Sequence, residues 1–119
     1  MALTRDFKQT ILARARREPE FAVALLEESA NALLSGDAET ARAILRDLVN
    51  ATIGFERLAS LVDKPSKSLH RMLSARGNPG MDNLAAIFAV LRQYLKVDVQ
   101  THAFAKPGRI RQVTRKRAA

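Results

Sequence analysis

The sequence predicts an all-α protein, a compact bundle of helices that forms one small domain. Hydrophobic residues make up 47% of the 119 residues, with Ala and Leu dominant and aromatic residues at only 5%. Ala and Leu favour helices, whereas strands are usually rich in aromatic and β-branched residues. Apolar residues also recur at spacings of three and four in successive segments, which Pro, Gly and Asp separate. A chain of this length is suited to a single domain.

We expect residues 1–36 to form an N-terminal segment of two helices. Thr4 can cap the first helix, which continues to about Arg17. The apolar face of this helix repeats every four residues, at Phe7, Ile11 and Ala15. Pro19 suits the first turn of the second helix, and Gly36 suits the left-handed residue that follows its end.

Residues 37–95 are predicted to form four further helices around a shared core. Asp37 caps the first of them, and its apolar stripe contains Ala41, Ile44, Leu45 and Leu48. Two short helices follow at about 54–61 and 65–74, with Leu58, Ala59, Leu69, Met72 and Leu73 directed inward. The last helix, over 81–95, has a strong helical period.

The remaining residues are predicted to form an arm and a tail. In the arm, 96–105, Val97, Val99 and Thr101 alternate with polar neighbours, which allows a short C-terminal strand that could pair with its copy in a dimer. The alternative is a C-terminal extension that forms no strand. The tail, 106–119, has six basic residues and no acid, while the rest of the chain has 14 basic and 12 acidic residues. Such a tail suits nucleic acid, an anionic membrane or an acidic partner, or serves only as a flexible solubilising segment.

The stretch FERLASLVDKPSKSLHRMLS, residues 55–74, divides what could be one helix into two. Asp63, Lys64 and Pro65 supply the turn, because Asp tolerates left-handed backbone and Pro pre-sets the φ angle of a helix start. Two helices that cross steeply at such a turn form a helix-turn-helix, whose second helix fits the DNA major groove. The alternative is a helical hairpin with a solvated polar face.

The polar residues of this corner are candidates for DNA contact. Lys67, at the start of the second helix, could donate to guanine O6 and N7. Arg71, Lys64 and Arg76 are placed to reach phosphates, and amides near Thr52, Ile53 and Gly54 could hold one more at the first helix's N-terminus. The predicted DNA-binding residues are Thr52, Gly54, Lys64, Ser66, Lys67, Ser68, His70, Arg71 and Arg76.

The segment LASLVDKPSKSLHRMLSARGNPGMDNLAAIFAVL resembles the helix-turn-helix of Cro/C1-type (Xre-type) regulators. With the preceding LLSGDAETARAILRDLVNATIGFERLA it is similar to addiction-module antidotes, or antitoxins, of that class; the resemblance covers about residues 21–95. It implies a bundle of about five helices and base reading by Ser66 and Lys67, then His70, with Arg71 on a phosphate. The family commonly has Gly at the position of Asp63, a small apolar residue at that of Lys64 and a Ser N-cap at that of Pro65.

An enzyme is not expected, although Ser66 and His70 lie four residues apart on one helix. No Gly-rich turn or oxyanion hole accompanies them, and no catalytic residues are predicted. With no Cys and only two histidines, His70 and His102, we expect no metal site, no cofactor and no disulfide. No secretory or membrane-spanning stretch is evident, so we expect a cytoplasmic protein without a membrane partner.

The predicted function is sequence-specific binding of double-stranded DNA by a homodimeric transcriptional repressor. The antidote resemblance implies a toxin–antitoxin operon that the protein regulates itself, with a small toxin protein as a further partner. A stand-alone regulator without a toxin is one alternative. A helical protein-interaction module, which binds a toxin or another partner but no specific DNA, is the alternative from another class.

Overall fold

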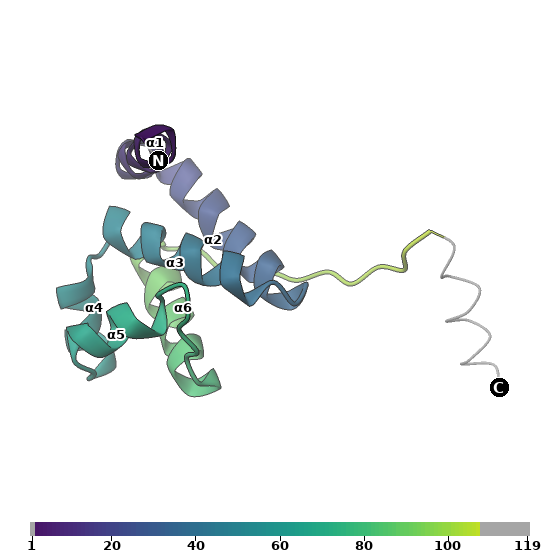
Figure 1. Cartoon of the computed structure of the whole chain (residues 1–119). Helices are drawn as coiled ribbons and strands as arrows, with labels where there is room; N and C mark the ends of the chain where they lie inside the picture. The colour runs from purple at the N-terminus through teal and green to yellow at the C-terminus, as the bar shows by residue number, and fades with distance from the viewer. Residues whose placement is uncertain (1, 108–119) are drawn as a thin grey trace.

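The computed structural model describes the backbone of residues 2–107 and the side chains of residues 7 and 9–107. Within this range the chain is all-α, as predicted, with six helices (Figure 1). They are α1 (Ala2–Arg17), α2 (Pro19–Leu34), α3 (Ala38–Ala51), α4 (Phe55–Val62), α5 (Ser66–Met72) and α6 (Met81–Leu95). Helices α2 and α3 form an antiparallel pair, α1 lies across its upper end, and α4 to α6 pack below α3 (Figure 1).

Most helix boundaries lie where Pro, Gly and Asp predict them. Pro19 is the first residue of α2, and Gly36, just after that helix, has a φ of 87° that a residue with a side chain rarely adopts. Asp37 caps α3, since its carboxylate accepts the amide N–H of Thr40 at 3.2 Å. The start of α1 is corrected: Thr4 lies inside the helix, which begins at Ala2, so Thr4 is not its cap.

The Asp37 cap makes the stability of the protein depend on pH. Hydrogen bonds from Thr40 lower the pKa of Asp37 below its usual value of 3.8. A lowered pKa in the folded state stabilises the protein above the unfolded pKa, and that stabilisation is lost as the pH falls through the folded pKa. We therefore expect Asp37→Ala to be less stable than the wild type at pH 6 and the difference to shrink below pH 3.8, measured by thermal melts at both pH values.

One hydrophobic core joins all six helices. Helix α3 is central: it contacts α1, α2 and α4, and its Leu45, Leu48 and Val49 are fully buried in the core. The other fully buried large apolar side chains are Leu26, Leu58, Leu69, Leu73, Ile87 and Leu91. Of the residues predicted to point inward in the two short helices, all are buried except Met72, which is half-buried against the core. This shared core holds α4 and α5 against the rest of the protein.

The predicted strand at Val97 to Thr101 is not present, and residues 97–106 have no regular secondary structure. Lys96 ends α6 in a left-handed conformation, with φ 59°, and the Val97 amide donates to the Arg92 carbonyl oxygen at 3.0 Å. Val97 and Val99 are half-buried against the core, while the intervening residue faces solvent. The alternation therefore reflects an extended arm that packs on the helices, and the arm then leaves the body (Figure 1).

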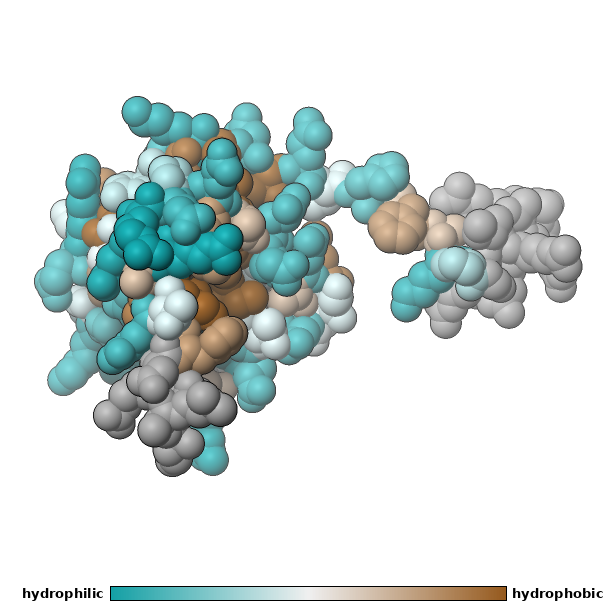
Figure 2. All heavy atoms as spheres, turned by 90° about the horizontal axis from the view of Figure 1, so that it is seen from above, coloured by the Kyte–Doolittle hydropathy of each residue, from teal (hydrophilic) through white to brown (hydrophobic). Residues whose placement is uncertain are grey.

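The surface is mostly hydrophilic, with apolar atoms exposed near the middle of the upper face (Figure 2). Among the described side chains, the exposed large hydrophobic ones are Phe7, Leu34, Leu61, Met81, Tyr94 and Phe104. They lie on several different elements. None of the helices within residues 2–107 has the length and apolar character needed to cross a lipid bilayer.

Candidate nucleic-acid interface

The corner between α4 and α5 is a tight turn of three residues. Asp63 ends α4 in the left-handed region, with φ 55° and ψ 49°. The Lys64 amide donates back to the carbonyl oxygen of Ala59 at 3.1 Å, which closes the end of α4. Pro65 is extended and precedes α5 directly, and its carbonyl oxygen accepts the Ser68 and Leu69 amides at 3.0 and 3.2 Å. The left-handed residue redirects the chain, so that α5 begins at once in a new direction.

A second turn places the start of α4. Gly54 has a φ of 82°, and its amide donates to the carbonyl oxygen of Val49 at 2.8 Å. The Thr52 amide donates to the carbonyl oxygens of Leu48 and Val49, and its hydroxyl donates to that of Leu48 at 2.6 Å. The amides of Thr52 and Gly54 thus hold the end of α3. They are not free to bind a phosphate at the N-terminus of α4, which corrects that part of the sequence-based hypothesis.

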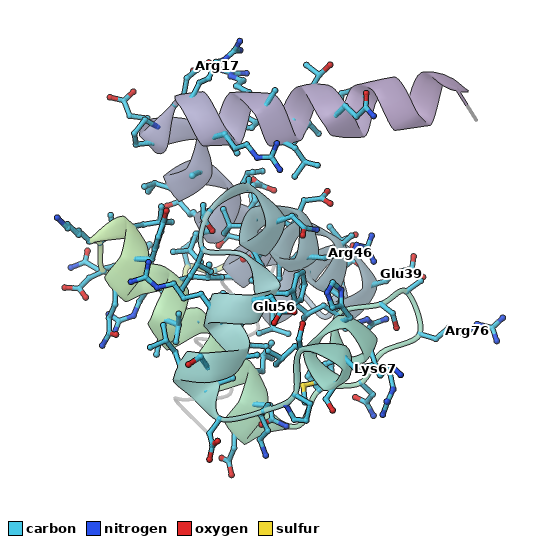
Figure 3. The ribbon with its side chains drawn as sticks, turned by 90° about the vertical axis from the view of Figure 1, so that its left-hand side faces the viewer. Arg17, Glu39, Arg46, Glu56, Lys67 and Arg76 are labelled. Atoms are coloured by element: carbon cyan, nitrogen blue, oxygen red, sulfur yellow. The ribbon has the colours of Figure 1, made fainter. Side chains whose placement is uncertain are left out.

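The other residues predicted to contact DNA differ in how far they are exposed to solvent. Lys64, Lys67, His70, Arg71 and Arg76 are exposed, whereas Ser66 and Ser68 are half-buried. The side chains of Lys67 and Arg76 extend into solvent from α5 and from the loop after it (Figure 3). Four of the exposed residues are Lys or Arg, and between residues 52 and 80 five Lys or Arg residues outnumber two acids.

His70 is exposed but has a partner within the protein. Its imidazole stacks on the ring of Phe55, with 3.9 Å between the ring centroids and 21° between the ring planes. Phe55 is buried at the first turn of α4, so the stack joins the start of α4 to the middle of α5. Sequence reasoning assigned His70 to the outer face alone. The structure adds a packing role that holds its ring in one orientation.

Two arginines that the sequence analysis did not select hold the other end of α5. Arg42 on α3 donates from Nε to the carbonyl oxygen of Ser74 at 3.1 Å and from Nη2 to that of Ala75 at 2.9 Å. Arg46, one turn later, donates from Nη1 to the carbonyl oxygen of Leu73 at 3.1 Å. The four-residue spacing of the two arginines beside the apolar stripe of α3 is the only signal that the sequence offered.

The chain after α5 folds back closely over the end of that helix. Gly77 has no room for a side chain, because a Cβ there would lie 2.5 Å from the Arg71 carbonyl oxygen and closer still to that of Met72. The Gly77 amide donates to the carbonyl oxygen of Ser74 at 3.0 Å, and the Ser74 hydroxyl donates to that of Arg71 at 2.7 Å. The C-terminal end of α5 is thus closed by the protein itself.

The cavity between the N-terminal helices and the helix-turn-helix region has no catalytic constellation. This cavity of about 310 Å³ lies where α1 and α2 meet the ends of α3 and α6, and Arg16 is its one charged lining residue. Its lining residues are Ala15, Arg16, Pro19, Ala22, Ala51, Thr52, Tyr94 and Leu95. No group of three or more His, Cys, Asp or Glu side chains with metal-binding geometry occurs in the part of the chain that the structure describes.

No protein-family model, curated protein sequence or solved structure matches the chain in a significant way.

Proposed function

We propose that the protein binds double-stranded DNA through α4 and α5 and represses transcription, with α5 in the major groove. The observation that carries the proposal is the asymmetry of α5: its C-terminal end is closed by Arg42, Arg46 and Gly77, while Lys67 stands exposed near its start. A helix held at one end and free and basic at the other suits insertion into a groove of negative potential.

The resemblance of this corner to Cro/C1-type regulators supports the same proposal. In such proteins a homodimer places two recognition helices in successive major grooves, about 34 Å apart, and occludes the promoter. The similarity to antitoxins extends the proposal to repression of the protein's own operon, next to a gene for a small toxin. The alternative, a stand-alone regulator, would bind DNA in the same way but would have no toxin gene beside it.

The first test is a fluorescence-anisotropy titration of the full chain with the DNA upstream of its own gene and with a scrambled duplex of equal length. We expect tighter binding to the upstream DNA, and we expect this preference to remain when the salt concentration is raised. Base contacts discriminate between sequences, whereas phosphate contacts weaken equally on both duplexes as salt increases. Equal and salt-sensitive binding to the two duplexes would contradict the proposal.

Lys67→Ala is expected to weaken binding to the specific site by about 1–3 kcal/mol, because Lys67 is the exposed cation nearest the start of α5. The measurement is the same titration on both duplexes. Arg17→Ala on α1 is a matched control, since it removes one exposed cation that points away from the corner (Figure 3). An equal loss on scrambled DNA would make Lys67 a phosphate contact and not a base reader.

A protein-interaction module is the second candidate, and the exposed apolar residues of the N-terminal helices favour it. Phe7 on α1 is 65% exposed and Leu34 at the end of α2 is 69% exposed, both outside the helix-turn-helix. The adjacent gene distinguishes the candidates: co-purification of its product with this chain would support a protein partner. If Phe7→Ser abolished that co-purification and left DNA binding unchanged, both candidates would hold on separate surfaces.

A further inference from the structure

We infer that Arg42 and Arg46 are positioning residues, which set the angle of α5 and thereby the ability of the protein to discriminate between DNA sequences. The inference rests on the proposed DNA binding for its functional part, while its structural part concerns the protein alone. Neither arginine was among the predicted DNA contacts. Both are half-buried, and both donate hydrogen bonds to backbone carbonyl oxygens of the protein.

The need for such residues follows from the length of α5. The helix has seven residues, about two turns, and so short a helix is not stable on its own in water. Two buried leucines, Leu69 and Leu73, press α5 onto the core, but apolar contacts are non-directional and leave its tilt weakly specified. The stack of His70 on Phe55 orients the middle of α5, and hydrogen bonds of fixed geometry are needed to set the position of its C-terminal end.

The two arginines provide that geometry at three consecutive carbonyl groups. Arg42 bridges Ser74 and Ala75, and Arg46 binds Leu73. The Leu73 carbonyl belongs to the residue that caps α5, at the negative end of the helix dipole, where cations are favourable, and the Ser74 and Ala75 carbonyls follow directly after the cap. Because the guanidinium group is planar and rigid, the pair of bonds from Arg42 fixes both the distance and the orientation of the chain that directly follows the α5 cap. A Lys ammonium group at position 42 lacks this planar fork.

The consequence appears at the opposite end of the helix. A small rotation about the anchored end displaces Lys67, which is six to eight residues before the anchored carbonyls. Base recognition requires hydrogen bonds within a narrow range of distance. Phosphate contacts tolerate such a displacement more easily, because they depend mainly on charge. Loss of the arginines is therefore expected to reduce discrimination more than overall affinity.

The test compares Arg42→Met, Arg46→Met and Arg42→Lys with the wild type and with Arg17→Met, an exposed control on α1 (Figure 3). The chain has no Cys, so Glu39→Cys and Lys67→Cys introduce a clean pair of spin labels on α3 and α5 for DNA-free distance measurements. Label-free versions of the same variants are titrated with upstream and scrambled DNA. Circular dichroism at the assay temperature verifies that each variant is folded. If a Met variant does not fold, Arg42→Lys replaces it in the comparison, because it keeps the positive charge and removes only the planar fork.

We expect a broader or shifted label distance in the arginine variants and not in the control. The ratio of upstream to scrambled affinity should fall about tenfold in Arg42→Met, while scrambled affinity changes no more than in Arg17→Met. Unchanged label distances in the arginine variants would overturn the positioning role, whatever the DNA titrations show. Equal losses on both duplexes would overturn the role in discrimination. If the distances change but the wild type itself shows no preference, the DNA proposal fails and the positioning of α5 stands.

Discussion

Replacing Gly77 by Ala is expected to lower the free energy of unfolding by about 3 kcal/mol, which corresponds to about 10 °C in melting temperature. The new Cβ would overlap the carbonyl oxygens of Arg71 and Met72. Both are backbone atoms near the end of α5, so neither can move away without disturbing that helix. The chain after α5 would have to shift, and the bond from the Gly77 amide to Ser74 would be strained or lost.

Gly80→Ala is the matched control for this prediction. Gly80 lies three residues further along the same loop, where an added Cβ would meet no atom within 4 Å and the φ angle of −66° suits any residue. We expect a change below about 1 kcal/mol. The melting temperatures of the wild type and the two variants, followed by circular dichroism, test this prediction. Equal stability of Gly77→Ala and Gly80→Ala would show that the loop is not packed as described.

Leu69→Ala is the second substitution for which we expect a large effect, a loss of about 2–5 kcal/mol. Leu69 is 1% exposed, at the centre of α5, and it joins this short helix to the common core. Truncation removes apolar contacts and leaves a cavity that the surrounding helices cannot fill completely. The measurement is the free energy of unfolding in urea, compared between Leu69→Ala and the wild type.

Leu61→Ala provides the comparison on the neighbouring helix. Leu61 belongs to α4 and is 58% exposed, so truncation removes little buried area and Ala is a good helix former. We expect a change of about 0.5 kcal/mol or less. A large loss in Leu61→Ala would mean that Leu61 is covered in solution, for example by a second copy of the chain.

The sequence was sufficient where local chemistry decides the structure. Pro19 marks the start of α2, and Gly36 and Asp37 mark the junction of α2 and α3, because each has a strong preference for one backbone conformation or cap. Asp63 was expected to tolerate left-handed backbone at the α4–α5 turn, and it adopts that conformation. The all-α class and the inward positions of Leu58, Leu69 and Leu73 followed from the spacing of apolar residues.

The sequence was insufficient where residues far apart in the chain decide the structure. The alternation of Val97 and Val99 predicted a strand, but burial against helices requires the same alternation without a partner strand. Arg42 and Arg46 were not selected from the sequence, because their carbonyl partners lie between 27 and 33 residues later in the chain. The stack of His70 on Phe55 also joins two helices, and no local pattern indicates it.

The closed end of α5 also has a consequence for the order of folding. A helix of two turns has an unfavourable nucleation step, so α5 does not persist before its surroundings exist. Its capping groups belong to α3, and they reach its carbonyls only after the chain between residues 42 and 75 has closed into a loop. Helix α5 is therefore expected to form late, in one cooperative step with the docking of α3, and to be absent from the folding nucleus.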